Sequence, residues 1–182
     1  MKLLIFRPLL PCLLLVAAGC GNEPAPKPAV PPEVSPLATP AISRPVSSAD
    51  VVKASVAPVE ISVGSSGEAN VSISIAQGYH VNANPATFPY LIATAVTAEQ
   101  STGITVGKPV YPAALVKTFS FEKERPLSVY EGTTAVKLPL QLAGNAAKGP
   151  RSIPLAVRVQ ACDDAACYAP ATLNAALQLT VK

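Results

Sequence analysis

The stretch SIPLAVRVQAC, residues 152–162, carries an apolar side chain at every second position from Ile153 to Val159. Successive side chains of an extended strand point to opposite faces, so this spacing predicts a strand with one buried and one exposed face. The same alternation recurs in ANVSISIA (69–76) and TLNAALQLTVK (172–182). The larger, carboxyl-terminal part of the chain is therefore expected to be built from strands.

Further short segments have the composition of strands and are separated by Gly, Pro and Asn. They are VEISV (59–63), QGYHVNANP (77–85), YLIATAVT (90–97), ITVGKPVY (104–111) and AVKLPLQLAG (135–144). No segment predicts a long helix. About seven or eight strands in one domain, residues 51–182, indicate an all-β fold: an antiparallel β-sandwich of immunoglobulin-like architecture.

The amino terminus, MKLLIFRPLLPCLLLVAAGC (1–20), has the layout of a secretory signal. Lys2 and Arg7 form a positive region, and the apolar run that follows is too short to span a bilayer comfortably. The segment AAGC resembles a bacterial lipobox, which implies a signal peptide of residues 1–19 and a diacylglycerol thioether on Cys20. The protein is then expected in the bacterial cell envelope, facing the periplasm and held on a membrane by its lipid. The alternatives are an ordinary cleaved signal that contains a cysteine and a short helical anchor.

Residues 24–45 contain eight prolines among 22 residues. Proline lacks the backbone N–H and fixes φ, which excludes a helix or a paired strand. We expect residues 20–50 to form a lipid-anchored, proline-rich linker in extended polyproline II form, a stalk that carries the domain 51–182. The alternative is a disordered leader of unselected length.

The net charge is small. The chain has 14 basic and 11 acidic residues, a formal charge of +3, and loss of Lys2 and Arg7 with the signal leaves +1. There is no run of basic residues and no tryptophan. These features argue against a nucleic-acid partner.

Two of the four cysteines belong to the predicted domain. Cys12 leaves with the signal and Cys20 would carry lipid, so Cys162 and Cys167 remain as thiols. They flank a turn between two predicted strands, in a chain expected in an oxidising compartment. A disulfide between them is therefore chemically reasonable.

Such a pair could be a structural staple, part of a zinc site or a redox centre. A staple that closes a loop of about six residues stabilises a fold by roughly 2 kcal/mol, less than a bridge between distant strands, which favours redox chemistry. Structural zinc needs four ligands, commonly as two pairs. His80, Asp163 and Asp164 complete no recognised zinc spacing, so no metal is expected. Because the sulfurs themselves exchange, no cofactor is expected either.

Two carboxylates lie beside the pair. Asp163 and Asp164 follow Cys162 directly, and no basic residue lies between the cysteines. Nearby carboxylates favour the neutral thiol over the thiolate. We therefore expect raised thiol pKa values and slow reaction until a docked partner creates a thiolate, which alkylation rates against pH would test.

Three stretches resemble the amino-terminal periplasmic (alpha) domain of DsbD, the thiol:disulfide interchange protein. They are VQACDDAACYAP (159–170), GYHVNANPATFPYLIATAV (78–96) and FSFEKERPLSVYEGTTAVKLPL (119–140), and the resemblance covers residues 55–182. It implies an immunoglobulin-like sandwich whose redox pair exchanges disulfides with thioredoxin-fold partners.

The resemblance also implies roles for single residues. Cys167 looks like the cysteine that forms the mixed disulfide with a partner, and Cys162 like the cysteine that resolves it. A cap loop shields the pair in the family. Here that loop corresponds to residues 119–125, with Phe119 or Phe121 as the shield.

The predicted function is a periplasmic thiol–disulfide exchange module that relays reducing equivalents between thioredoxin-like partners, as a protein-disulfide reductase or interchange component would. Full-length DsbD adds a membrane electron-transfer domain and a carboxy-terminal thioredoxin-like domain. Neither is present in this sequence, so electrons are expected from a separate membrane donor. The alternative is a non-catalytic immunoglobulin-like envelope lipoprotein with a structural disulfide that binds another protein.

A few other residues carry expectations. Tyr168 and Pro170, after the second cysteine, are candidates for partner docking, with packing as the alternative for Tyr168 and a turn for Pro170. His80 is expected to be structural, with its ring hydrogen-bonded. Tyr130 and Glu131 are expected to begin the strand after the cap region.

Overall fold

The computed structural model describes residues 47–182. One short helix, α1 (Ser48–Val51), precedes twelve strands. The strands are β1 (Val52–Val56), β2 (Val59–Ile61), β3 (Ser66–Ile75), β4 (His80–Asn82), β5 (Ala95–Ala98), β6 (Ile104–Val106), β7 (Leu115–Phe119), β8 (Glu122–Tyr130), β9 (Thr133–Leu142), β10 (Gly149–Val159), β11 (Ala161–Cys162) and β12 (Ala171–Val181). The predicted signal peptide, Cys20 and the linker up to residue 46 lie outside the described residues. Within residues 47–182, no helix has the length and hydropathy needed to cross a bilayer.

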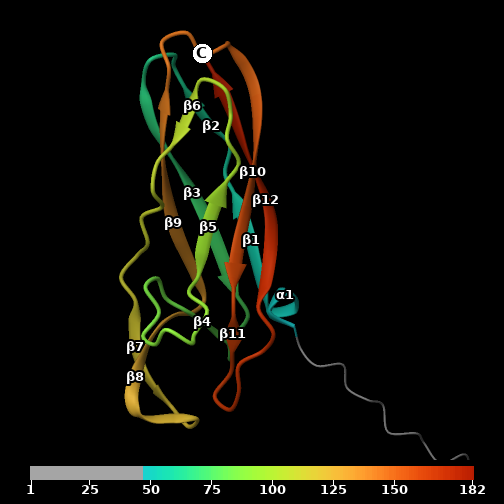
Figure 1. Ribbon diagram of the computed structural model, residues 1–182. Coiled ribbons are helices and arrows are strands. Elements are labelled where there is room, and N and C mark those ends of the chain that lie inside the picture. The colour runs from blue at the N-terminus through green and yellow to red at the C-terminus, as the bar shows by residue number, and fades with distance from the viewer. Residues whose placement is uncertain (1–46) are drawn as a thin grey trace, which may run out of the picture. The chain divides into compact units, whose positions relative to one another are not determined.

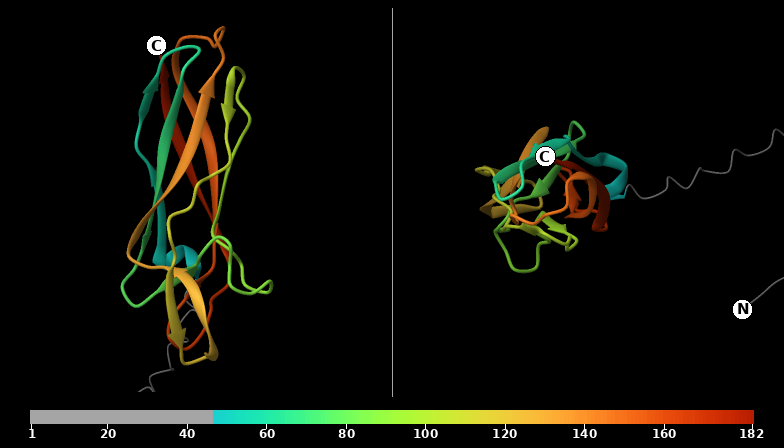
Figure 2. Two further views of the ribbon diagram at one scale, coloured as in Figure 1. Left: turned by 90° about the vertical axis from the view of Figure 1, so that its left-hand side faces the viewer. Right: turned by 90° about the horizontal axis from the view of Figure 1, so that it is seen from above.

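The strands form three four-stranded sheets (Figure 1). Two of them, in the orders β1-β3-β9-β6 and β2-β12-β10-β5, are the layers of a sandwich, and the third, β11-β4-β8-β7, lies at one end (Figure 2). Paired strands run antiparallel, except that β2 runs parallel to β12. The fold is the all-β, immunoglobulin-like sandwich that the sequence predicts.

Alternation along the long strands determines which side chains fill the core. In β10, Ile153, Leu155, Val157 and Val159 are buried, and the residues between them are not. β3 and β9 follow the same pattern, and the apolar faces of both layers meet in one cluster. Burial of each such side chain favours folding by roughly 1.5–3 kcal/mol. The prediction from SIPLAVRVQAC is therefore confirmed for β10.

The predicted cap loop is a β-hairpin. β7 and β8 pair antiparallel, with Phe119 opposite Glu122 near the tip. In β7, residues 115–118 are exposed and only Phe119 is buried. β7 is an edge strand of the end sheet and buries only its last residue, so its sequence lacks the alternation that marked the other strands.

The strand boundaries near this hairpin differ from the expectation. Tyr130 ends β8 instead of beginning a new strand, and β9 begins at Thr133. Glu131 and Gly132 make the connection between them, with Gly132 at φ 61°. This left-handed conformation favours glycine, because a side chain would clash with the backbone there.

Other predicted strands are shorter than expected. The stretch 90–97 enters the sheet only at β5, because the residues before it form a turn in which the Leu91 N–H donates to the Phe88 carbonyl. The stretch 104–111 pairs regularly only as β6, before Pro109 interrupts the run. β1 lies outside every predicted segment and pairs with β3.

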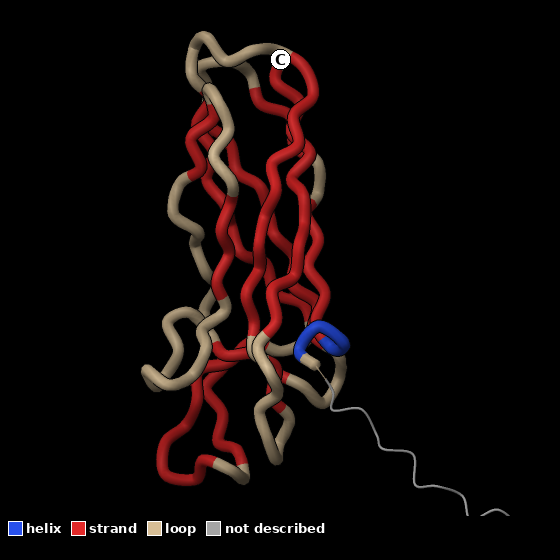
Figure 3. Tube along the Cα trace, turned by 45° about the vertical axis from the view of Figure 1, so that its right-hand side comes forward, coloured by secondary structure: helices blue, strands red, loops and turns tan. Residues whose placement is uncertain are grey.

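Three segments that are distant in sequence meet at one end of the sandwich. The β7–β8 hairpin lies at the end away from the carboxyl terminus in two perpendicular views (Figure 2). The loop between β11 and β12 and helix α1 lie at the same end (Figure 3). A second apolar cluster packs there, formed by Phe88, Phe119, Leu127 and Val129.

Candidate functional site

The two cysteines of the domain form a disulfide at this end. Cys162 is the last residue of β11, and Cys167 lies in the loop that leads to β12. The S–S distance is 2.01 Å, and the two Cα atoms are 3.9 Å apart. Cys162 is fully buried, whereas Cys167 is exposed. Cys167 is thus the half of the disulfide that an incoming thiolate can reach.

The strand β11 carries Cys162 out of the sandwich layer. After β10 ends, the chain crosses to the end sheet, where Ala161 pairs with Val81 and Cys162 pairs with His80 of β4. Directly opposite residues of an antiparallel pair hold their side chains on the same face of the sheet. His80 is distant from the cysteines in sequence, yet it is the cross-strand neighbour of Cys162.

Helix α1 fixes both sides of the cysteine loop through one hydroxyl. Ser48 Oγ accepts a hydrogen bond from the Ala161 N–H (2.9 Å) and donates one to the Ala169 carbonyl (2.7 Å). Ser48 is fully buried. Ser48 lies within residues 20–50, which the sequence predicts to be linker, and the sequence does not predict this contact. The signal that could have found the helix is the capping box, in which Ser47 and Asp50 bond each other's backbone N–H groups.

Asp163 organises the loop between the cysteines. Its Oδ1 accepts hydrogen bonds from the N–H groups of Ala165 and Ala166, both at 2.8 Å, and its Oδ2 accepts one from the Tyr168 hydroxyl. The Tyr168 N–H in turn donates to the Ala161 carbonyl (2.8 Å). The loop is therefore closed by its own polar groups in addition to the disulfide.

These hydrogen bonds shift two pKa values in opposite directions. The bond from the Tyr168 hydroxyl, followed by those from the two alanine N–H groups, lowers the pKa of Asp163. The same bond to the carboxylate raises the pKa of Tyr168 to about 12. At neutral pH the pair is therefore a carboxylate that accepts from a protonated hydroxyl.

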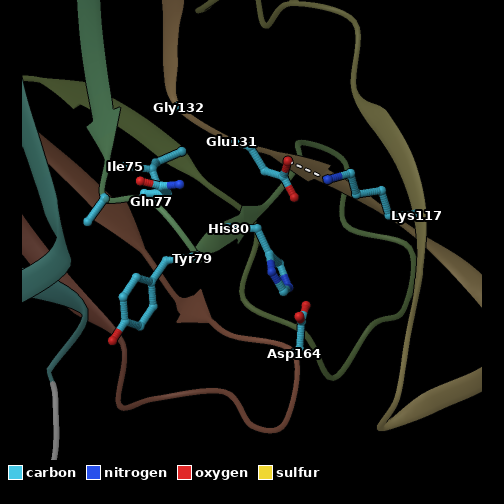
Figure 4. A pocket seen from close by; sticks show the side chains of 10 residues that line it. Ile75, Gln77, Tyr79, His80, Lys117, Glu131, Gly132 and Asp164 are labelled. Carbon is cyan, nitrogen blue, oxygen red and sulfur yellow. Dashed lines mark hydrogen bonds and ion pairs between the residues drawn. The ribbon is translucent and has the colours of Figure 1, made fainter.

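The neighbouring aspartate points elsewhere. The Asp164 carboxylate points toward the His80 ring in a hollow of about 450 Å³ that Lys117 and Glu131 also line (Figure 4). The Asp164 carbonyl accepts a hydrogen bond from the Ser120 hydroxyl at the tip of the β7–β8 hairpin. The expected effect of both aspartates on the thiol pKa values stays a prediction.

The two phenylalanines of the hairpin occupy different positions. Phe119 is 6% exposed and stacks on the His80 ring, with 4.0 Å between ring centroids. Phe121 is 39% exposed and lines a hollow of about 420 Å³ that Cys167 also lines. Phe121 is therefore the ring that lies beside the exposed sulfur, and Phe119 covers the histidine.

His80 differs from the structural histidine that the sequence predicts. His80 is 2% exposed, and its Nε2 has no hydrogen-bond partner among the described residues. The expectation of a hydrogen-bonded ring is therefore wrong for this nitrogen. Burial lowers the pKa of His80, against the opposing effect of the Glu131 and Asp164 carboxylates. The imidazole is accordingly neutral at pH 7.

Tyr168 and Pro170 have unequal surroundings. The Tyr168 ring lies 5.9 Å from the Tyr79 ring, centroid to centroid, and its hydroxyl is held by Asp163. Pro170 is exposed directly before β12. Packing of the ring therefore accounts for part of the role of Tyr168. Docking of a partner by Tyr168 or Pro170 stays a prediction.

No group of three or more His, Cys, Asp or Glu side chains that could hold a metal ion occurs within residues 47–182. The chemistry at hand in this part of the chain is that of a disulfide with one exposed and one buried sulfur. Around it lie an aspartate-ordered loop, a buried neutral imidazole and a hairpin that carries two aromatic rings.

Residues 48–179 match the family described as the N-terminal part of the thiol:disulfide interchange protein DsbD. The chain belongs to this family. The family is one of thiol–disulfide interchange modules of the cell envelope that interact with thioredoxin-like redox proteins. A comparison with curated protein sequences gives no match.

Several solved structures are similar to the chain. The reduced N-terminal domain of DsbD from Neisseria meningitidis is 18% identical, with a TM-score of 0.42 over 65% of this chain and 80% of that one. The N-terminal periplasmic domain of ScsB from Proteus mirabilis is 11% identical, with a TM-score of 0.43 over 68% of this chain and 43% of that one. A type I cohesin from Pseudobacteroides cellulosolvens is 9% identical, with a TM-score of 0.43 over 72% and 92%.

Proposed function

We propose that this domain relays reducing equivalents between thioredoxin-like partners through reversible opening of the Cys162–Cys167 disulfide. The observation that carries the proposal is the unequal exposure of the two cysteines. Cys167 is exposed and Cys162 is fully buried, which supports separate roles for attack and for resolution. A bridge that served only as a staple would have no need of this asymmetry.

In the reducing direction, a partner thiolate attacks the Cys167 sulfur in line with the S–S bond. That bond breaks, Cys162 leaves as a thiolate, and a mixed disulfide joins Cys167 to the partner. The second thiol of the partner then attacks the mixed disulfide and releases Cys167, so that the partner is oxidised and the domain is reduced by two electrons. The oxidising direction is the same sequence in reverse, with Cys162 as the attacking thiolate.

The hairpin supplies a shield for this chemistry. Phe121 lines the hollow beside Cys167, and the Ser120 hydroxyl bonds the cysteine loop through the Asp164 carbonyl. A docked partner that displaces the hairpin tip would widen access to Cys167, whereas small thiols in solution would meet Cys167 with Phe121 beside it. Tyr168 and Pro170, next to Cys167, are the residues through which such a partner would dock.

The setting of the domain is part of the proposal. Cys20 carries a lipid anchor, the proline-rich linker spans the distance to the domain, and the electrons come from a separate membrane protein. The sequence features of residues 1–50 and the family of residues 48–179 support this arrangement. Palmitate labelling of cells, with Cys20→Ser as the control, tests the anchor.

The reduction potential of the pair tests the relay. Titration with glutathione and thiol trapping should give a potential above roughly −300 mV, the range of exchanging pairs. A potential well below that value is typical of structural disulfides and would support the non-catalytic binding protein instead. Partner capture gives a second readout: Cys162→Ala should accumulate mixed disulfides on Cys167. The matched variant Cys167→Ala should not accumulate them, because its remaining thiol is buried.

A further inference from the structure

His80 and Cys162 are partners on the end sheet, and both are buried. They lie directly opposite each other in the antiparallel pair of β4 and β11. Side chains at such positions share one face, with their Cβ atoms about 4.5–5.5 Å apart. His80 Nε2 has no partner among the described residues. A buried polar atom without a hydrogen bond is an exception in folded proteins, and a redox or catalytic role is one explanation of it.

The imidazole is held firmly at this position. Phe119 stacks on it with 4.0 Å between centroids and an interplanar angle of 20°, and Phe121 lies nearly parallel at 6.4 Å. Stacking on Phe119 helps to hold the ring in one orientation without using Nε2. Nε2 therefore remains available for another group.

The charged groups that face the ring come from three elements. Asp164 and Asp163 belong to the cysteine loop, Glu131 follows β8, and Lys117 lies on β7. Lys117 Nζ and Glu131 Oε2 form an ion pair at 2.5 Å, which offsets part of the negative charge. Burial outweighs the carboxylates and lowers the pKa of His80, so the ring is a neutral proton acceptor at pH 7.

We propose that His80 is the proton acceptor for the Cys162 thiol when Cys162 resolves a mixed disulfide, and the proton donor for the Cys162 thiolate in the reverse step. This inference rests on the relay proposed above. Cys162 needs such a proton acceptor because it is buried, and burial disfavours its thiolate.

The step balances in protons and electrons. The Cys162 thiol gives its proton to the neutral imidazole, and the thiolate attacks the Cys167 sulfur of the mixed disulfide. The Cys162–Cys167 bond forms, and the partner leaves as a thiolate, reduced by two electrons. The imidazolium then releases its proton to solvent through the hollow lined by Asp164 and Glu131 (Figure 4).

Reaction of the reduced protein with the aromatic disulfide 5,5′-dithiobis(2-nitrobenzoate) tests this step. Attack by Cys167 releases one thiobenzoate anion, and resolution by Cys162 releases the second, so stopped-flow absorbance shows two phases. Cys162→Ala should show only the first phase, which assigns the second phase to resolution. The readout is the rate of the second phase between about pH 5.5 and pH 10.

With His80 as the proton acceptor, the second phase of the wild type should stay nearly constant from pH 8 down to about pH 6. In His80→Phe, which keeps the stacked ring, the rate should fall about tenfold per pH unit below the thiol pKa. It should be about 10²-fold slower than wild type at pH 7, at the lower end of general-base effects, and should meet the wild type at high pH. Tyr79→Phe, one residue away, is the matched control and should follow the wild type.

The outcomes separate this inference from the relay. A wild type that releases only one equivalent of thiobenzoate would overturn both. A second phase that falls tenfold per unit in the wild type, or a His80→Phe rate lowered equally at every pH, would overturn the role of His80 and leave the relay intact. His80→Gln repeats the comparison with a polar side chain. The wild-type profile alone can overturn the role of His80 even if both variants fail to fold.

Discussion

The Tyr168 hydroxyl donates a hydrogen bond to Asp163 Oδ2 across the loop that joins the two cysteines. Asp163 follows Cys162, and Tyr168 follows Cys167, so this bond joins the residues next to the two cysteines. The loop is thus closed twice, once by a covalent bond and once by a charge-assisted hydrogen bond. In the reduced protein, the Tyr168–Asp163 hydrogen bond forms only if the loop keeps its shape. The order of the loop is therefore linked to the equilibrium between the dithiol and the disulfide.

Tyr168→Phe should make the disulfide easier to reduce. Without the hydroxyl, the reduced loop samples more conformations and the two thiols meet less often. The equilibrium constant for forming the disulfide should therefore fall a few-fold. Glutathione titration with thiol trapping measures the change. Tyr79→Phe is the control, because the Tyr79 hydroxyl makes no hydrogen bond within residues 47–182. Equal potentials for both variants would show that the bond does not preorganise the loop.

Phe121→Ala should open access to Cys167 at little cost in stability. Phe121 is 39% exposed and lines the hollow beside the sulfur. We expect a several-fold faster reduction by dithiothreitol and a change in unfolding free energy of less than about 1 kcal/mol. Stopped-flow reduction and urea unfolding give the two values.

Phe119→Ala is the matched comparison and should behave in the opposite way. Phe119 is buried in the cluster with Leu127 and Val129, so its loss should cost about 3–5 kcal/mol of unfolding free energy. If both variants had the same effect on reduction rate and on stability, Phe121 would not be a separate shield and Phe119 a separate core residue.

The sequence predicted the sandwich because its long strands each bury one face. Ile153 to Val159 alternate since the two layers cover one side of β10, and the same holds for β3. The strand β7 escaped prediction because residues 115–118 are exposed on both faces at the edge of the end sheet. Periodicity reports burial, and an element that buries little leaves no periodic signal.

Some residues of the candidate site could be predicted from the sequence and others could not. Cys162 and Cys167 were recognisable because they lie close in sequence at a turn. His80 and Ser48 were not, since each contacts the site only through tertiary structure: His80 through the pairing of β4 with β11, and Ser48 through bonds to Ala161 and Ala169. Spacing along the chain carries no information on such contacts.

Ser48→Ala should destabilise the domain through the cysteine loop. The change leaves the buried Ala161 N–H without an acceptor, which costs about 1–3 kcal/mol of unfolding free energy. Ser74→Ala, at an exposed position of β3, is the control and should change stability by less than about 0.5 kcal/mol. Urea unfolding of the oxidised protein measures both. Equal effects would mean that the Ser48 hydroxyl is replaced by solvent.

His80 should make the stability of the folded domain depend on pH near neutrality. Its folded-state pKa lies below the ordinary value of 6.5, because burial disfavours the charged ring. Below pH 6.5 the unfolded chain therefore binds a proton that the folded domain does not, and stability is lost as pH falls toward the folded-state pKa. One such proton changes the unfolding free energy by at most about 1.4 kcal/mol per pH unit.

The measurement is urea unfolding of wild type and His80→Phe at pH 7, 6 and 5. Carboxylates with lowered pKa values, such as Asp163, also lose their contribution on acidification, but they do so at lower pH and in both proteins. The difference between the two curves therefore isolates the histidine. It should widen in favour of His80→Phe as pH falls from 6.5, because phenylalanine keeps the stack on Phe119 and carries no proton. Parallel curves would mean that the buried ring is protonated as readily as in the unfolded chain, and that burial does not lower the pKa of His80.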